Sequence, residues 1–523
     1  MSRKIIAACA CGLLLSAGAS PSLAGEEPSR HPLGVYAHVN VETALSTKFG
    51  HSKPGPAAEH AYLQRLYKGL LENDDAVSGI TLGVHWDTLE PYFPQCDIDN
   101  SCLPPTQDTD GYDWSWLDDV FLEANTYDKT VQLILTPGVD SPAWLYPLLG
   151  PTCDSLFPPK TPPKQLPDCG FVKFSVFPEM QHADRHLMPL PWNGSYQSYW
   201  KRFLTNVKDR YSTNKAFVSI AIAGPICAST EMILPSDANG STQASGTPAN
   251  EAWTTLIQNS FPHSDYDYQH SDQVFIAQWK TAIDAYVEVF ARTTTFPGVT
   301  LILSPDSGDN MPQFYDNYFP PNPAWPYVKE CSASDYPMSC EAKTEVIAYF
   351  LKKEASDRKA TQVGGMTASS PLKLGNIDVP GVKLLTSFST QTPAILGGAE
   401  FDHSVSEESE RQEEGCPSFP KSTCPGLPFV GFTTEEATYN VLKVFFNQTK
   451  YAGYYGGTEG EAPIQWVDLN YTDIIYAQDH PALLPSTVPC SPSLQDLLDR
   501  ASWDLFSISG SKPPVPAPPK CEQ

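Results

Sequence analysis

The chain has 523 residues, a formal net charge of −26 at pH 7 and a sequence pI of about 4.7. A charge of this sign argues against nucleic acids, polyanionic glycans and anionic membrane surfaces as partners, and it favours a neutral or cationic substrate. The 50 prolines and the 41% of hydrophobic residues are typical of a globular protein with long, rigid loops.

The first 24 residues have the pattern of a secretory signal peptide. Arg3 and Lys4 precede an apolar run from Ile5 to Leu15, and small residues follow up to Ala24. The run is too short to span a bilayer, and no later segment is a transmembrane candidate. We therefore expect 1–24 to be removed and the mature protein to be secreted or periplasmic, with no membrane insertion. The oligomeric state is left open.

Short apolar runs rich in β-branched residues alternate with segments of helical period along the mature chain. Eight such units predict parallel strands joined by crossover helices, and at this length they predict a (β/α)₈ TIM barrel. A doubly wound sheet is the alternative, but no Gly-rich phosphate-binding motif follows any strand. The predicted strands are 33–39, 79–91, 130–138, 217–224, 298–306, 361–367, 393–401 and 450–457. The predicted helices are 58–73, 114–129, 196–211, 272–293, 343–359, 434–449 and 493–508, with the sixth not placed. We expect a single catalytic domain over 25–510 and an extended Pro-rich tail over 511–523.

Ten cysteines form local couples in the long segments that follow strands, which predicts disulfide-stapled βα loops in an oxidising compartment. The couples are Cys96/Cys102, Cys153/Cys169, Cys331/Cys340, Cys416/Cys424 and Cys490/Cys521. Cys227 is left over, and a buried thiol is the favoured interpretation. No C-x-x-C spacing occurs, and we expect neither a metal nor a cofactor.

Polar and aromatic side chains follow the predicted strands, at the barrel end where catalytic residues lie. Carboxylates bind hydroxyl groups and indoles stack on pyranose rings, so this combination suggests a carbohydrate substrate. The candidate substrate-binding residues are His85, Trp86, Asp140, Trp144, Thr230, Asp306 and Trp466. For His85, Trp86, Trp144 and Trp466 a packing role is the alternative, and for Asp140 and Asp306 a strand-end cap.

Three segments carry a resemblance to a known family. The segments "GPICASTEMILP" (224–235), "PAILGGAEF" (393–401) and "GVHWDTLEP" (83–91) resemble parts of retaining glycoside hydrolases of clan A, which share the (β/α)₈ barrel. The resemblance implies that Glu231, after strand four, is the acid/base and that Glu400, at the end of strand seven, is the nucleophile. Thr230 departs from the Asn that usually precedes the acid/base, so a hydrogen bond to the sugar 2-hydroxyl has to come from a hydroxyl instead. No family within the clan is assigned.

The sequence thus predicts an O-glycosyl hydrolase that cleaves a neutral β-linked glycan or glycoside with retention. Two carboxyl groups are needed because one protonates the leaving oxygen while the other attacks the anomeric carbon. Alternatives stay open at both positions: a buried ion pair for Glu231, and Glu459 or Glu461 as the nucleophile. A non-catalytic glycan-binding barrel is the other candidate function, followed by a metal-dependent barrel hydrolase.

Overall fold

A computed structural model of the chain describes the following residues. They are 30–50, 54–72, 74–92, 111–157, 168–175, 187–227, 232–237, 239–261, 272–290, 293, 296–304, 345–350, 361–363, 398–401, 406, 434–435, 438–439, 442, 466–480, 493–508 and 511–516.

Eight parallel strands form one sheet in the order β10-β11-β1-β2-β3-β6-β8-β9. Within this sheet, strands that follow one another along the chain are neighbours from β1 to β9, and the last strand, β11, pairs with both β10 and the first strand, β1. This is the strand order of a (β/α)₈ barrel; within the described residues, the edge strands β9 and β10 are not paired with each other. The strands are β1 (Gly34–Asn40), β2 (Val77–His85), β3 (Thr130–Thr136), β6 (Phe217–Ala221), β8 (Thr300–Leu303), β9 (Thr361–Val363), β10 (Gly398–Phe401) and β11 (Trp466–Asn470).

Side-chain contacts show that the sheet is curled. Asp468 on β11 and Gln132 on β3 are three strands apart, which is about 14 Å in a flat sheet. The Gln132 Nε2 nevertheless donates to Asp468 Oδ1 over 2.9 Å. Thr81 on β2 donates to the same oxygen at 2.7 Å, and Ser219 on β6 donates to Gln132 Oε1 at 2.9 Å. A buried polar network therefore crosses the concave side of the sheet.

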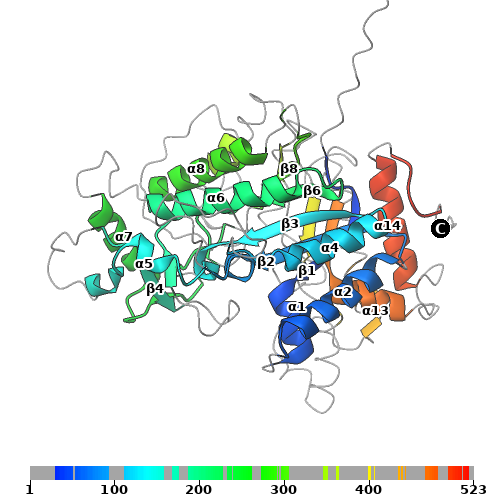
Figure 1. Ribbon diagram of the computed structural model, residues 1–523, viewed down its shortest axis with the longest axis horizontal. Coiled ribbons are helices and arrows are strands. Elements are labelled where there is room, and N and C mark those ends of the chain that lie inside the picture. Colours follow the sequence, from blue (N-terminus) through cyan, green and yellow to red (C-terminus); the bar gives the residue numbers. More distant parts are fainter. Residues whose placement is uncertain are drawn as a thin grey trace, which may run out of the picture.

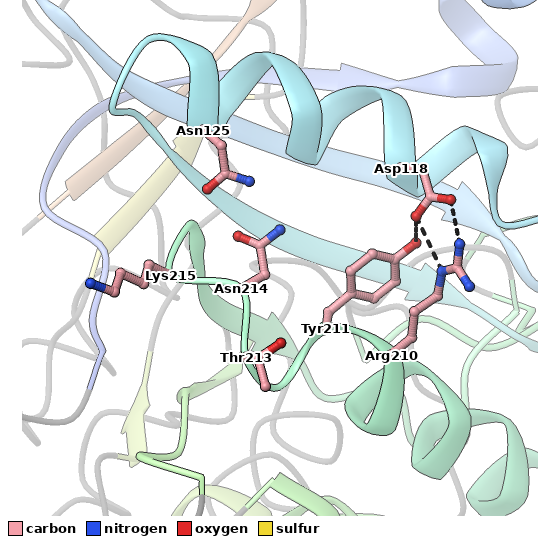
Figure 2. Close-up of a pocket in the computed structure, with 7 residues that line it drawn as sticks. All are labelled: Asp118, Asn125, Arg210, Tyr211, Thr213, Asn214 and Lys215. Atoms are coloured by element: carbon pink, nitrogen blue, oxygen red, sulfur yellow. Dashed lines mark hydrogen bonds and ion pairs between the residues drawn. The ribbon is translucent and has the colours of Figure 1, made fainter.

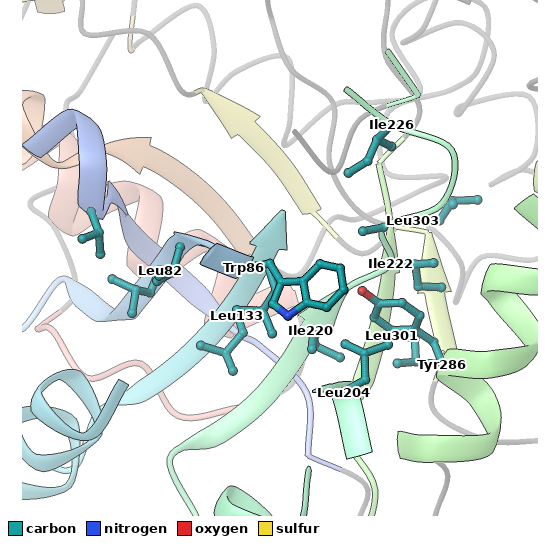
Figure 3. Close-up of a cluster of buried hydrophobic side chains, with 14 of the residues drawn as sticks. Leu82, Trp86, Leu133, Leu204, Ile220, Ile222, Ile226, Tyr286, Leu301 and Leu303 are labelled. Carbon is teal, nitrogen blue, oxygen red and sulfur yellow. The ribbon is translucent and has the colours of Figure 1, made fainter. Parts of the chain in front are cut away.

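The convex side of the sheet carries the main hydrophobic core. Alternate strand residues such as Val35, Leu82 and Leu133 point to this side and pack against the apolar stripes of the helices. In Figure 1, α6 and α8 lie along one side of the strands, and α2 and α4 lie along the other. Figure 3 shows part of this core, with Leu133, Ile220 and Leu301 on strands facing helix residues such as Leu204 and Tyr286. The helices are α1 (Val41–Phe49), α2 (Pro56–Glu72), α3 (Trp86–Leu89), α4 (Ser115–Thr126), α5 (Tyr146–Leu149), α6 (Gly194–Tyr211), α7 (Ala249–Ser260), α8 (Asp272–Phe290), α13 (Tyr471–Asp479) and α14 (Leu494–Ile508).

The eighth strand differs from the sequence prediction. The strand that pairs with β1 is β11, at 466–470, and not the segment 450–457, which lies outside the described residues. The other seven predicted strands each contain or overlap a strand of the sheet. Position 466 is therefore the first residue of the eighth strand, and positions 459 and 461 precede this strand.

Two long loops add a small antiparallel sheet that the sequence did not predict. It contains β4 (Phe171–Ser175) and β5 (Leu187–Pro189) from the β3–α6 connection, and β7 (Thr242–Gln243) from the β6–α8 connection. With α5 and α7, β4 lies at one end of the molecule, away from α13 and α14 (Figure 1). The Cys153–Cys169 disulfide confirms one predicted couple; the other four lie outside the described residues. No described helix has the length and hydropathy of a membrane span.

Candidate active site

The carboxyl ends of three neighbouring strands bring an imidazole between two carboxylates. His85 is the last residue of β2, Glu42 lies in the first turn of α1 directly after β1, and Asp140 follows β3. The Nδ1 atom of His85 lies 3.6 Å from Glu42 Oε1 and 3.5 Å from Asp140 Oδ1. His85 and Asp140 are buried, whereas 18% of the Glu42 side chain is exposed. We call this group the Glu42–His85–Asp140 cluster; its oxygen and nitrogen atoms suit hydrogen bonds to hydroxyl groups.

Glu42 is held in place by the segment that follows β2. Its Oε1 accepts hydrogen bonds from the His85 backbone N–H at 3.2 Å and from the Thr88 hydroxyl at 2.7 Å. Glu42 is not among the site residues predicted from the sequence, because that prediction covers only residues at the end of an apolar run. The signal was nevertheless available, since Glu42 is the first acid after the first strand.

The loops that follow β3 and β6 meet beside this cluster. The Val139 N–H donates to the Cys227 carbonyl oxygen at 2.9 Å. The Cys227 thiol is buried outside any disulfide, as predicted, and burial together with the nearby Asp140 charge raises the pKa of this thiol. Asp140 therefore faces His85 on one strand end and the loop after β6 on the next.

Trp86 and Trp144 belong to an aromatic cluster that packs against side chains of α6. Trp86 is fully buried, with its ring centroid 5.1 Å from that of Trp200, and its Nε1–H donates to Glu90 Oε2 at 2.7 Å. Trp144 is partly exposed and donates from Nε1 to the Glu90 carbonyl oxygen at 2.9 Å. Arg202 of α6 forms an ion pair with the fully buried Glu90 carboxylate. These contacts pack both indoles against their neighbours, and a substrate-binding role stays a prediction for each.

The proposed catalytic pair is described only in part. Glu231 and Thr230, with Asp306 further along the chain, lie outside the described residues, as do Glu459 and Glu461. Position 400 is in β10, one residue before its end, and its backbone is in register with Asp468 of β11. The roles of Glu231 and Glu400 thus stay predictions.

Trp466 lies at the opposite end of the sheet from the one expected. It is the first residue of β11, in register with Gly34 at the start of β1, and its side chain is fully buried. It packs with Tyr36, Ala221 and Ile302 on the concave side. The expectation of a sugar platform assumed that the eighth strand had already ended, and the position of β11 corrects this.

An open surface hollow of about 620 Å³ is lined by residues of α4, by the end of α6 and by the segment that leads into β6. Asp118 and Arg210, which line it, form an ion pair, and the Tyr211 hydroxyl donates to Asp118 at 2.8 Å (Figure 2). Because its charged groups bind one another at the amino ends of the strands, we do not take it as the active site. Among the described residues, no group of three or more His, Cys, Asp or Glu is placed to hold a metal ion.

Comparisons with known proteins found structures but no sequence relatives. No family model matches the chain, and no curated protein matches it. The chain is similar to the catalytic domain of β-amylase from Paenibacillus polymyxa, with TM-score 0.42, 11% identity, and coverage of 92% of this chain and 100% of that one. It is also similar to a GH10 xylanase from termite gut (TM-score 0.36, 11% identity, 91% and 77% covered) and to endo-glycoceramidase II from Rhodococcus sp. (TM-score 0.33, 12% identity, 84% and 73% covered).

These structural neighbours are glycoside hydrolases of clan A, the group that the sequence resembles, and no family within it is assigned. These TM-scores lie below 0.5, so the likeness carries no conclusion about the activity of this chain.

Proposed function

We propose that this protein is a secreted, retaining glycoside hydrolase that acts on a neutral β-linked glycan or glycoside, on a closed (β/α)₈ barrel. The supporting observation is the strand order. The fourth strand is β6, and the loop after it carries Glu231; the seventh strand is β10, which contains Glu400. In such a barrel the ends of these strands share one face with the Glu42–His85–Asp140 cluster.

The mechanism requires two carboxyl groups about 5–5.5 Å apart. Glu400 attacks the anomeric carbon while Glu231 protonates the leaving oxygen, which forms a glycosyl ester and releases the alcohol. Glu231, now ionised, removes a proton from water, and the water oxygen displaces Glu400 from the anomeric carbon. Two inversions at the same carbon give net retention. No cofactor takes part.

The cluster supports a substrate rich in hydroxyl groups. Glu42, with 18% of its side chain exposed, can accept a hydrogen bond from a sugar hydroxyl, and the buried His85 ring lies between it and Asp140. The net charge of −26 disfavours acidic glycans, so a neutral sugar is proposed. Export is supported by the 1–24 segment and by the Cys153–Cys169 disulfide, since such bonds persist in oxidising compartments.

Hydrolysis of a panel of neutral aryl α- and β-glycosides tests the function directly. We expect cleavage of at least one β-glycoside, and proton NMR should show the β-anomer as the first product. Formation of the α-anomer first would contradict retention. Absence of cleavage across the panel and across neutral β-glucans and β-galactans would contradict the proposal itself.

The two catalytic assignments have separate tests. Glu231→Gln should lower kcat/KM for substrates with poor leaving groups by about 100-fold or more and largely spare kcat/KM for activated aryl glycosides, because kcat/KM reports the first step and only poor leaving groups need a proton from the acid in that step. A fluorosugar inactivator should label Glu400, and a label on Glu459 would transfer the role of nucleophile there. The exposed Glu72→Gln on α2 is the control for loss of one carboxylate.

A further inference from the structure

An amide side chain lies beside the Glu42–His85–Asp140 cluster on the concave side of the sheet. Asn40 is the last residue of β1 and is in register with Gly83, two residues before His85 on β2. Because side chains alternate along a strand, Asn40 points to the same side as Tyr36, which packs in the concave interior. A Cβ built on Gly83 would lie 3.2 Å from Asn40 Nδ2, so the amide of Asn40 covers this glycine.

The two polar atoms of the Asn40 amide have different tasks. Its Oδ1 accepts a hydrogen bond from the Thr43 N–H at 2.9 Å and thereby caps the start of α1. Because the oxygen is held by the helix, the amide cannot turn, and its nitrogen faces away from Thr43. In the part of the chain that the structure describes, no group accepts a hydrogen bond from Nδ2, and Asn40 is partly exposed. The amide nitrogen is thus a fixed hydrogen-bond donor that a ligand can reach.

The concave side is accessible next to this donor. His38, two residues before Asn40 on β1, is partly exposed, and so is Ile134, which is in register with Gly83 on the concave side of β3. By contrast, the side chains of His85 and Asp140 are buried. A substrate that enters the curled sheet therefore meets Asn40 before it meets the buried members of the cluster.

We propose that Asn40 is a substrate-binding residue that determines which sugar is accepted: its Nδ2 donates a hydrogen bond to one hydroxyl oxygen of the glycan, beside the partly exposed carboxylate of Glu42. This inference rests on the proposed function. A sugar hydroxyl both donates and accepts, whereas an ionised carboxylate only accepts, so the amide supplies the donor that Glu42 lacks. A site that binds a hydroxyl in this way rejects the analogue without that hydroxyl, because a polar group of the protein then loses its partner.

The first test removes the donor and keeps the helix cap. Asn40→Ser and Asn40→Asp both retain a side-chain oxygen for the Thr43 N–H, and Ser, Asp and Asn cap helices about equally well, so the melting temperature should stay close to that of the wild type. We expect both changes to lower kcat/KM for a cleaved glycoside by about tenfold or more, because each removes a hydrogen bond to the substrate.

Asn214→Asp is the matched control for the exchange of an amide for a carboxylate. Asn214 precedes β6 at the amino ends of the strands, and its Oδ1 accepts from the Ala216 N–H at 3.0 Å, so this variant also keeps its acceptor and adds one negative charge. It should leave kcat/KM unchanged.

The second test identifies the hydroxyl. The glycoside that the wild type cleaves best is compared with its monodeoxy analogues, each of which lacks one hydroxyl. The wild type should discriminate against one analogue in particular, and Asn40→Ser should cleave that analogue and the parent with nearly equal kcat/KM. The other analogues should keep the same ratio to the parent in both proteins.

Gly83→Ala gives an independent measurement if the Asn40 variants do not fold. Its methyl group would lie 3.2 Å from Nδ2 and has to push the amide aside, so we expect the same selective effect, reduced in size. Wild-type rates in Asn40→Ser, a loss in Asn40→Asp alone, or an equal loss on the parent and every analogue would each overturn the inference and leave the proposed function standing. A wild-type protein that cleaves no glycoside would overturn the proposed function, and the inference with it.

Discussion

At the scale of single residues, charged side chains in this protein have very different surroundings even on one helix. Arg202 and Arg210 both lie on α6 and both pair with a carboxylate from the neighbouring segments. Glu90, the partner of Arg202, is fully buried, whereas Asp118, the partner of Arg210, has 45% of its side chain exposed. The burial of the carboxylate, rather than the presence of an ion pair, decides how much each arginine contributes to the free energy of unfolding.

Loss of the arginine should therefore have unequal effects. Arg202→Met leaves the Glu90 carboxylate buried without its cation, and we expect a loss of about 3–5 kcal/mol in the free energy of unfolding. Arg210→Met breaks an exposed pair and should cost about 0–1 kcal/mol. Urea denaturation measures both values. Glu90→Gln combined with Arg202→Met should recover part of the loss; equal effects of the two single changes would refute the argument.

The residue scale also shows where sequence reasoning stopped. The sequence predicts His85 and Asp140 because each lies at the carboxyl end of an apolar strand. Glu42 lies at the start of a helix, and only the folded chain shows it beside His85. The sequence gives no signal at Gly138, because the atom that leaves no room for a Cβ there is the carbonyl oxygen of Cys227, almost ninety positions away in the chain.

At the scale of elements, hydrophobic periodicity located seven strands and failed at the eighth. The strand β11 reads Trp-Val-Asp-Leu-Asn, and its Asp468 belongs to the polar network on the concave side. A polar residue that faces the interior breaks the apolar run by which a buried strand is recognised. The aromatic segment 450–457 resembled a strand more closely. The strands β4, β5 and β7 lie inside the long connections between the strand–helix units, so they do not follow the alternation by which the other strands are predicted.

One helix carries a pH-dependent contribution to stability. On α14, the pKa of Asp499 is raised by burial and further by the charges of Asp74, Asp496 and Asp75, although a hydrogen bond from Gln495 opposes this. A raised pKa means that the folded state binds the proton more tightly than the unfolded state. The resulting stability is present below the unfolded pKa of about 3.9 and is lost as pH rises through the folded value.

Asp499→Asn should therefore stabilise the protein at neutral pH, because it removes a carboxylate that folding makes unfavourable to ionise. The difference from wild type should shrink as pH falls and vanish below about pH 4, where wild-type Asp499 is protonated in both states. Melting temperatures across this pH range measure the effect. Asp504→Asn on the same helix controls for the loss of one charge, and an Asp499→Asn gain that is independent of pH would contradict the prediction.

At the scale of the whole molecule, the two ends of the curled sheet have different roles. Polar and titratable side chains collect at the carboxyl ends of β1, β2 and β3. On the concave side, Tyr36 and Trp466 at the start of β1 and β11 pack against Ala221 and Ile302 of β6 and β8. Strands β2 and β3 lie between these two pairs of strands in the sheet order. The contact across the concave side therefore fills the interior of the curled sheet next to the polar network.

This arrangement gives Trp466 a structural role with a measurable size. Trp466→Ala removes a fully buried indole from the interior, and we expect a loss of about 3–5 kcal/mol in the free energy of unfolding. The milder Trp466→Phe should keep most of the stability and leave KM for a cleaved glycoside unchanged. A sugar platform would behave in the opposite way, with a large rise in KM and little loss of stability.

Trp144→Ala, at a partly exposed indole near the other end of the sheet, is the comparison, because its smaller buried area predicts a smaller loss of stability. If Trp466→Phe raises KM while the unfolding curve stays in place, the interior position of this side chain is contradicted.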